Sequence, residues 1–396
     1  MKEWIKISDL LFFQEGPGVR NTQYTQSGVK LLNVANLVNG KVDLSTSDRY
    51  ISEDEAFGRY KHFLCDDGDF IIASSGIKVE YFDKKMGFVD SSMLPLCMNT
   101  STIRFKVIDS ERLNIKYFMY YLKSLHFKQQ LSKFITGSAQ LNFGPSHLKK
   151  MNMPLVSLKE QNDIVEKLSK VELLLDKYNG EIKLLDELIK ARFVEMFGDP
   201  IENQKNWQIV KIRDIVTDVR YGTSKPAVEG GKYPYLRMNN LTVDGGLDLS
   251  DLKYIDIPDN EIEKCVVRKG DILFNRTNSI DLIGKTAVFN LLDDMVIAGY
   301  IIRIRLNDQI LPDVFSQYMN LEAMKKVLKG MAKGAVNQAN INAQELQSIK
   351  VYIPNMELQK QYVEFKEEID KSRSRIEKSL EASQELFDSL MQEYFG

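Results

Sequence analysis

One stretch of about forty residues occurs twice in the chain, and this repeat constrains the fold more than any other feature of the sequence. The first copy begins with Met-Pro-Leu-Val-Ser-Leu-Lys-Glu-Gln at residues 153–161 and ends with Glu-Met-Phe-Gly at residues 195–198. The second begins with Ile-Pro-Asn-Met-Glu-Leu-Gln-Lys-Gln at residues 353–361 and ends with Glu-Tyr-Phe-Gly at residues 393–396. Because the two endings are 198 positions apart (396 − 198), the 396 residues divide into two similar halves.

Each copy is predicted to form one long helix, because its apolar residues recur in alternating steps of four and three. In the first copy these residues are Ile164, Leu168, Val171, Leu175, Tyr178, Ile182, Leu185 and Ile189. In the second copy they are Ile369, Ile376, Leu380, Phe387, Leu390 and Tyr394, and the same seam passes through Arg373 and Ser383. This heptad spacing keeps an apolar seam facing a partner helix, and polar seam positions fix the register of the pair. We therefore predict that the two helices pair with each other; the alternative is two unrelated amphipathic helices, each packed on its own domain.

Length and composition exclude several classes of protein. With 43% hydrophobic and 27% charged residues, the chain is long enough for two or three globular domains. The three cysteines and three histidines are isolated, which predicts neither a disulfide framework nor a zinc site. The apolar run at residues 10–13 is too short for a signal peptide or a membrane span. We therefore expect a cytoplasmic protein without membrane contact, and its net charge of −2 argues against holding nucleic acid by bulk charge alone.

The segments that precede the two helices can also be aligned with each other. Gly-Asp-Phe-Ile-Ile-Ala at residues 68–73 matches Gly-Asp-Ile-Leu-Phe-Asn at 270–275, and further short matches follow in the same order. These segments are rich in Val, Ile, Phe and Tyr and are separated by Gly, Asn and Asp, which is typical of strands joined by turns. Each half is therefore predicted to contain a mixed, mostly β domain.

Between the matched segments the loops differ in polar and basic content. Residues 16–24 read Gly-Pro-Gly-Val-Arg-Asn-Thr-Gln-Tyr, whereas 221–226 read Tyr-Gly-Thr-Ser-Lys-Pro. Gly-Ser-Ala-Gln-Leu-Asn at 137–142 is answered by an Asn-rich segment at 334–342, and such amides can bond an adenine edge or cap a turn. A common framework with different loops is what two readers of different targets would have, although neutral drift of the loops explains the difference equally well.

No constellation of catalytic residues is apparent. Gly-Lys-Thr at residues 284–286 ends like a phosphate-binding loop, but Ser279 stands where that motif needs its first glycine. Pro258-Asp259 with Glu263-Lys264 lacks the Glu-x-Lys spacing of a nuclease core. The Asn-Pro-Pro-aromatic tetrapeptide of amino-methyltransferases and a G-x-S-x-G elbow are also absent. Any chemistry is therefore expected elsewhere.

In this order the segments resemble the specificity subunit of a type I restriction-modification system, over the whole chain. The most informative are the segment at 137–142 leading to Met-Pro and the Lys-Glu-Gln helix start, Phe-Gly-Asp-Pro at 197–200, Trp207, and Gly-Asp-Ile-Leu at 270–273. The resemblance implies an α+β fold with two mixed, mostly β target-recognition domains and two long antiparallel coiled-coil helices in a pseudo-two-fold repeat. The expected boundaries are 1–153 and 199–353 for the domains, with 154–198 and 354–396 for the helices.

The resemblance also implies how the function is divided. Each domain would read one half of an asymmetric bipartite target in double-stranded DNA, and this chain would be non-catalytic. Two methyltransferase (modification) subunits would bind the helices and methylate adenine, while restriction or motor subunits would cleave DNA. No cofactor is expected on this chain, because S-adenosylmethionine, ATP and Mg would bind the partner subunits. The helix residues expected to contact partners are Leu168, Leu175, Ile182, Ile189, Ile376, Phe387 and Leu390.

We expect the DNA contacts to come from polar and basic residues of the variable loops. In the first domain these are Arg20, Asn21, Tyr24, Lys78, Gln140 and Asn142. In the second they are Lys225, Arg237, Asn275, Arg276, Asn278 and Asn337. Two other classes remain open: a coiled-coil interaction scaffold without DNA sequence readout, and a divergent nuclease that would cleave DNA alone in the presence of a metal.

Overall fold

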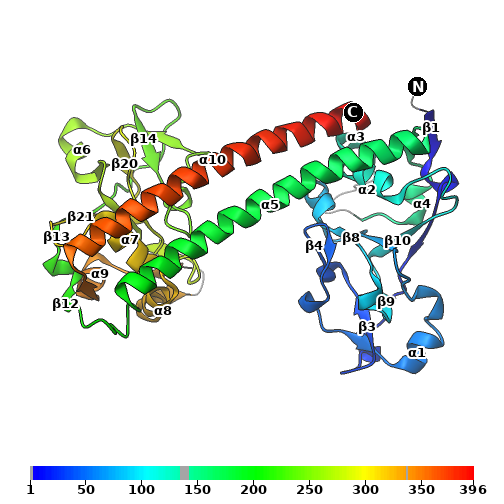
Figure 1. Ribbon diagram of the computed structural model, residues 1–396, viewed down its shortest axis with the longest axis horizontal. Helices are drawn as coiled ribbons and strands as arrows, with labels where there is room; N and C mark the ends of the chain where they lie inside the picture. The colour runs from blue at the N-terminus through cyan, green and yellow to red at the C-terminus, as the bar shows by residue number, and fades with distance from the viewer. Residues whose placement is uncertain (1–2, 134–141, 336–337) are drawn as a thin grey trace. The chain divides into compact units, whose positions relative to one another are not determined.

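The computed structural model describes residues 3–133, 142–335 and 338–396 (Figure 1). Contacts divide the chain into two compact units, one comprising Met1–Lys177 with Leu380–Gly396 and the other Tyr178–Ser379. We call them unit 1 and unit 2. Each unit therefore contains one globular domain and a part of each long helix. In the part of the chain that the structure describes, no helix is both long and apolar enough to cross a membrane.

The two long helices are α5, Leu158–Phe197, and α10, Met356–Phe395, each of 40 residues. Both begin at polar caps, since the Ser157 Oγ accepts from the Glu160 N–H at 3.3 Å and the Asn355 Oδ1 accepts from the Glu357 N–H at 2.7 Å. Gly198 ends α5 with φ +86°, a left-handed conformation that favours glycine, and its N–H donates to the Val194 carbonyl at 2.8 Å.

One glutamine anchors the start of each long helix to its domain. Gln161 of α5 is fully buried and donates from Nε2 to the Arg112 carbonyl at 2.8 Å, while its Oε1 accepts from the Asn114 N–H. Gln359 of α10 is also fully buried and makes the same pair of bonds, to the Gln309 carbonyl and from the Leu311 N–H. The Gln of the repeated motif therefore has the same structural task in both halves.

Within each unit the two helices pack in antiparallel directions. In unit 2, Asp186 of α5 forms an ion pair with Arg373 of α10, and further along Phe197 packs on Tyr362 at 5.5 Å between ring centroids. In unit 1, Lys167 Nζ of α5 donates to the Tyr394 hydroxyl of α10 at 3.3 Å. Because the α10 number rises as the α5 number falls, the pairing is antiparallel, and the predicted pairing of the two helices is confirmed.

Unit 1 is built on a four-stranded antiparallel sheet with the order β2-β10-β7-β8, beside a three-stranded sheet of order β6-β3-β9 and the ribbons β1-β11 and β4-β5. Its strands are β1 Glu3–Lys6, β2 Leu11–Glu15, β3 Val29–Leu32, β4 Leu37–Val38, β5 Lys41–Val42, β6 Tyr50–Ile51, β7 Phe70–Ala73, β8 Met86–Phe88, β9 Leu96–Met98, β10 Thr102–Val107 and β11 Asn152–Leu155. Its shorter helices are α1 Glu53–Phe57, α2 Ile115–Lys123, α3 Leu125–Ser132 and α4 Pro145–Leu148.

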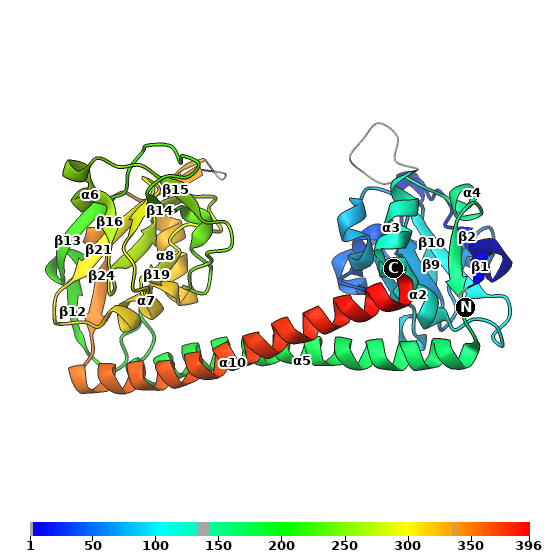
Figure 2. The same ribbon diagram turned by 90° about the horizontal axis from the view of Figure 1, so that it is seen from above.

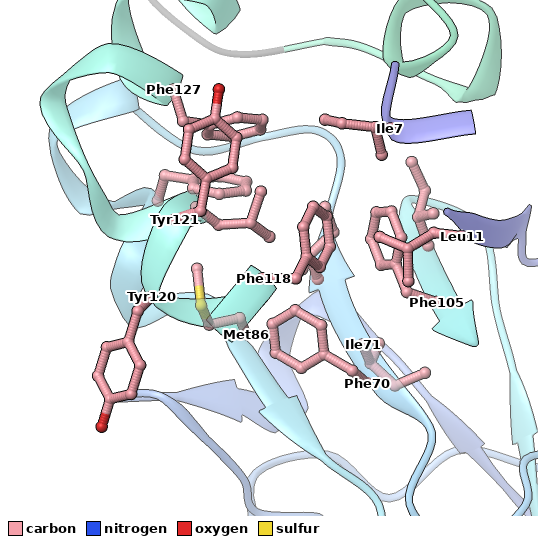
Figure 3. Close-up of a cluster of buried hydrophobic side chains, with 14 of the residues drawn as sticks. Ile7, Leu11, Phe70, Ile71, Met86, Phe105, Phe118, Tyr120, Tyr121 and Phe127 are labelled. Carbon is pink, nitrogen blue, oxygen red and sulfur yellow. The ribbon is translucent and has the colours of Figure 1, made fainter. Parts of the chain in front are cut away.

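The core of unit 1 lies between this sheet and α2, as Figure 3 shows. Phe70 of β7, Phe105 of β10 and Phe118 of α2 are fully buried, and the Phe105 and Phe118 rings are 5.0 Å apart. Another side of α2 contacts α10, where the Tyr117 ring packs on the Phe395 ring with 5.1 Å between centroids. The helix α2 therefore packs between the sheet and α10, an arrangement that can be followed in Figure 2.

Unit 2 repeats the same plan, with a four-stranded sheet of order β13-β21-β17-β19 and a second sheet of order β15-β14-β20-β16. Its strands are β12 Gln208–Lys211, β13 Val216–Tyr221, β14 Tyr233–Leu236, β15 Lys253–Ile255, β16 Val266–Val267, β17 Ile272–Asn275, β18 Thr277–Asn278, β19 Thr286–Val288, β20 Met295–Ile297, β21 Ile301–Leu306, β22 Lys333–Ala335, β23 Gln338–Asn340 and β24 Lys350–Ile353. Its shorter helices are α6 Asp259–Cys265, α7 Pro312–Asn320, α8 Glu322–Met331 and α9 Ala343–Ser348. The predicted internal repeat of mixed domains is confirmed.

Candidate nucleic-acid interface

In unit 1 the variable loops leave from one end of the four-stranded sheet. Strands β2 and β7 finish at this end, and their antiparallel neighbours β10 and β8 begin there. Backbone bonds tie the loops together, because the Ser74 N–H donates to the Ser101 carbonyl at 2.8 Å and the Phe143 N–H to the Ser74 carbonyl at 3.0 Å. The Val19 N–H donates to the Asn99 Oδ1 at 3.3 Å. We call this end of the sheet the loop end of unit 1.

Most of the expected residues of the first domain are accessible at this loop end. Arg20, Asn21, Lys78 and Asn142 are exposed, and Asn142 forms a backbone bridge with Ser75. Gln140 lies outside the described residues. The loop end therefore brings Asn142 to Ser75, three residues before Lys78, although the two segments are far apart in the sequence.

Tyr24 is held more firmly than the residues before it. It is half-buried, its hydroxyl accepts from the Asn99 Nδ2 at 3.4 Å, and the Arg49 guanidinium lies 5.4 Å from the centre of its ring. A cation over an aromatic face is attracted to the ring. Arg49 was not expected from the sequence, because it lies in a different loop and only the fold places it on Tyr24.

Unit 2 has an equivalent loop end. The Gly222 N–H donates to the Ile301 carbonyl at 3.1 Å, the Arg276 N–H to the Tyr300 carbonyl at 2.9 Å and the Ile341 N–H to the Arg276 carbonyl at 2.9 Å. These bonds join the loops that follow β13 and β17 to the segment before β21 and to β23. Here too, segments from four places in the sequence meet at one edge.

At the loop end of unit 2, two side chains hold the guanidinium of Arg276 in place. Its guanidinium lies 4.9 Å from the centre of the Tyr221 ring, and its Nη2 donates to the Asn340 Oδ1 at 3.1 Å. Tyr221 is 44% exposed and Tyr300 is 52% exposed, so two aromatic rings are accessible to a partner beside this arginine. A planar guanidinium on an aromatic face suits guanine edges or phosphate. The sequence singled out Arg276, whereas Tyr221, Tyr300 and Asn340 were not among the expected contacts.

Two other expected cations of the second domain are already paired with carboxylates. Lys225 Nζ is 2.9 Å from the Glu261 carboxylate, and Arg237 Nη2 is 2.7 Å from that of Asp251. Hydrogen bonds from these cations lower the pKa of Glu261 and of Asp251 below their usual values. Lys225 and Arg237 would have to exchange these partners before they could contact DNA.

The burial of Asn275 corrects one of the expected DNA contacts. Its side chain is fully buried, and its Nδ2 donates to the carbonyls of Thr277 and Tyr300 at 3.1 and 3.2 Å. Its Oδ1 accepts from the half-buried Asn278 at 2.8 Å. Asn275 therefore positions Asn278, and no atom of its amide is left for a base. Asn337 lies outside the described residues.

The structure corrects two of the seven expected partner contacts on the long helices, because these two side chains are buried. Leu168 is fully buried and Ile189 is 5% exposed, each within the core of its own unit, while the other five expected residues, Leu175, Ile182, Ile376, Phe387 and Leu390, are half-buried. The heptad seam therefore faces inward. Other leucines of α5 are exposed, among them Leu184 at 63% and Leu188 at 45% in unit 2. Being four residues apart, these two leucines share one face of the helix.

No metal site is found among the described residues, where no group of three or more His, Cys, Asp or Glu side chains lies close enough together to hold an ion.

The amine with the most strongly shifted pKa is Lys325 of α8. Burial, reinforced by the nearby Lys285 ammonium, lowers the pKa of Lys325 to about 7. Its Nζ donates to the Gly284 carbonyl and, at 2.7 Å, to the Asn320 Oδ1. These bonds give Lys325 a structural role.

Solved structures share this fold over the full chain. A type I restriction-modification S subunit from M. genitalium covers 100% of this chain with 96% of its own length, at a TM-score of 0.59 and 16% identity. A chain from a structure describing complex assembly and conformational transition of the type I R-M system covers 100% of this chain with 97% of its own, at a TM-score of 0.50 and 16% identity.

Sequence comparisons agree with the fold. The Escherichia coli type I restriction enzyme EcoKI specificity subunit is 22% identical over 277 residues, 66% of this chain and 60% of that protein. The putative MjaX specificity subunit of Methanocaldococcus jannaschii is 29% identical over 198 residues, 49% of this chain and 46% of that protein, so the match spans about half the length of these relatives. The family described as type I restriction modification DNA specificity domain matches residues 2–185 and 204–385. The chain therefore belongs to the type I restriction-modification DNA specificity family, with one specificity domain matched in each half.

Proposed function

We propose that this chain is the non-catalytic DNA-reading subunit of a type I restriction-modification complex, and that each unit reads one half of an asymmetric bipartite target. The observation that carries the proposal is the pair of loop ends. Both are built on the same sheet order, yet they present different side chains: exposed Arg20, Asn21 and Lys78 in unit 1, and Arg276 beside Tyr221 in unit 2. Base edges are read by such polar and planar groups, so unlike loop ends favour unlike half-sites.

In this proposal the chemistry belongs to partner subunits in the cytoplasm. Modification subunits, two per complex, would carry S-adenosylmethionine and methylate adenine, while restriction subunits would use ATP and Mg to cleave DNA. The fold shared with a chain from a structure of type I R-M complex assembly supports the expectation that this chain works inside a complex.

The test of DNA reading is an exchange of residues 1–150 for the corresponding domain of another family member, followed by mapping of methylated sites in the host. One half-site should change and the other should stay intact, because each unit has its own loop end. A change in both halves would contradict independent reading. Absence of sequence-dependent DNA binding in the presence of the modification subunits would favour a scaffold, and metal-dependent cleavage by this chain alone would favour a nuclease.

The partner surface we propose on α5 includes Leu184 and Leu188, since exposed apolar pairs on a helix are a common basis of protein docking. Changing both leucines to Glu should reduce co-purification of modification subunits while thermal unfolding of the chain alone is unchanged. Leu292→Glu is the matched control, because Leu292 is 87% exposed on the recognition domain of the same unit. Equal loss of partner with Leu292→Glu would contradict docking on α5.

A further inference from the structure

A basic hollow lies at the loop end of unit 1, between the end of β7 and the start of β8. It has a volume of about 410 Å³ and is lined by Val38, Asn39, Gly76, Ile77, Lys78, Tyr81, Lys84 and Lys85. Tyr81, Lys84 and the exposed Lys78 belong to one connection, with the short 3-10 helix Val79–Lys84 inside it. We call this site the lysine hollow.

The cations of the lysine hollow have no carboxylate partner among the described residues. Lys78, Lys84 and Lys85 form no ion pair there, and the nearby Asp83 is taken by Lys128 at 2.9 Å. Three positive charges around one hollow repel each other, which favours an anionic ligand from outside the chain.

An aromatic ring helps to organise the charge. Tyr81 is 51% exposed, and the Lys84 Nζ lies 5.5 Å from the centre of its ring. The ring face attracts the ammonium without neutralising it, so Lys84 keeps its full charge for a ligand.

The internal repeat shows that the fold itself does not require this cluster. The Ala73 N–H donates to the Lys85 carbonyl at 2.9 Å, and in unit 2 the Asn275 N–H donates to the Lys285 carbonyl at 2.8 Å, so the two lysines occupy equivalent positions. Lys285, however, is only 7% exposed, and its Nζ donates to the carbonyls of Met238 and Leu241 at 2.7 and 2.5 Å.

The other two lysines have no basic counterpart in unit 2. Counting back from the Lys85/Lys285 pair places Gly284 at the position of Lys84. Counting forward from the Ala73/Asn275 pair places the half-buried Ile280 at the position of Lys78, because the connection is two residues shorter in unit 2. Among the residues that the structure describes, unit 2 therefore presents no equivalent cluster.

We propose that Lys78, Lys84 and Lys85 bind backbone phosphates of duplex DNA, so that the first recognition domain carries a phosphate clamp that the second lacks. The inference rests on the proposed function, and it assigns Lys78 to the backbone instead of to a base. An ammonium group suits a phosphate as a compact point charge, whereas bases are read by planar or bidentate groups. The clamp lies beside Asn142 and its bridge to Ser75, where it would fix the position of the reading loops on the duplex.

The test measures DNA binding by the complex of this chain with its modification subunits, as a function of salt, for Lys78→Ala, Lys84→Ala, Lys85→Ala and the triple variant. Each neutralised phosphate contributes about 0.9 to the slope of log affinity against log salt. Each single variant should therefore lower the slope by about 0.9. When the salt is raised from 50 to 200 mM, the affinity of the variant should then fall about 3.5-fold less than the affinity of wild type. Cognate and unrelated duplexes should weaken by the same factor, because backbone contacts carry no sequence information.

The matched control is Lys61→Ala, an exposed lysine of unit 1 that does not line the hollow and should leave the slope unchanged. Lys84→Gln and Lys85→Gln repeat the loss of charge with longer side chains, and all variants should unfold at the wild-type temperature. If wild type binds its target but the triple variant keeps the full slope, the clamp is wrong and the proposed function stands. A change in preferred bases would also overturn the clamp, whereas failure of the wild-type complex to discriminate any sequence would sink the proposed function itself.

Discussion

The surroundings of Lys325 predict how much its substitution changes the free energy of unfolding. It lies on α8, where burial and the neighbouring Lys285 lower its pKa from 10.5 to about 7. The unfolded chain keeps the higher pKa, so between pH 7 and 10.5 the unfolded state binds more protons and the free energy of unfolding rises with pH. Below pH 7 both states are charged and the full cost of burying the ammonium is present. Lys325→Met should therefore stabilise the protein most at or below neutral pH.

The magnitude is set by the two pKa values of Lys325. Their difference, 10.5 − 7, corresponds to about 4.8 kcal/mol at about 1.36 kcal/mol per pH unit. The variant gives up the bonds to the Gly284 carbonyl and the Asn320 Oδ1, at about 1 kcal/mol each. Solvent screens the half-buried ammonium and reduces the remaining cost of burying it. Lys325→Met should therefore raise the free energy of unfolding by about 1–2 kcal/mol at pH 6.5. For a unit of this size that is about 2–8 °C in the temperature of unfolding.

The assay is thermal unfolding of the whole chain at pH 6.5, 8.0 and 9.5, with Lys326→Met as the control. Lys326 is the next residue on α8, but its side chain is 74% exposed and pairs with Glu322. The advantage of Lys325→Met should disappear at pH 9.5, where the wild-type amine is already neutral in the folded state. A difference between Lys325→Met and wild type that stays constant from pH 6.5 to 9.5 would refute the reasoning, as would an equal effect of Lys326→Met.

Three further predictions concern DNA. Arg276→Ala should cost about 1–3 kcal/mol of binding free energy and relax one base pair of the half-site read by unit 2, measured by selection from randomised sites, and unchanged selectivity would show that Arg276 reads no base. The isolated chain, with a net charge of −2, should bind DNA weakly, and both affinity and salt slope should rise with the modification subunits present; equal slopes would contradict this. Inserting four residues after Gly180 lengthens α5 by about 6 Å, so a library randomised in spacer length should prefer one or two more base pairs. Two inserted residues would rotate the seam by about 200° and should disrupt assembly, whereas an unchanged spacer in an active four-residue variant would mean that the helices do not measure DNA.

Local and periodic features were predictable from the sequence. The repeated motif predicted two long helices, and both form with 40 residues. The seam spacing predicted that they pair, and the polar seam position Arg373 meets Asp186 across the pair. These features follow from the sequence because a heptad repeat fixes which side of a helix is apolar, whatever the rest of the chain does.

The direction of individual loop side chains could not be predicted in the same way. Asn275 looked like a loop amide, but the fold buries it beneath Asn278, and Arg276 acquires its ring from Tyr221, 55 positions earlier in the sequence (276 − 221). The leucines of the seam looked available to partners, yet Leu168 is fully buried in its own unit.

The lysines that immediately precede β8 and β19 illustrate what the sequence and the tertiary structure each decided. The sequence by itself determined that both halves carry a lysine there, Lys85 and Lys285, because the framework repeats. Only the tertiary structure decided that Lys285 turns inward, where the carbonyls of Met238 and Leu241 receive its ammonium, while Lys85 lines an open hollow. The physical reason is that burying an ammonium requires acceptors in place, and those acceptors come from a loop more than forty residues away in the sequence.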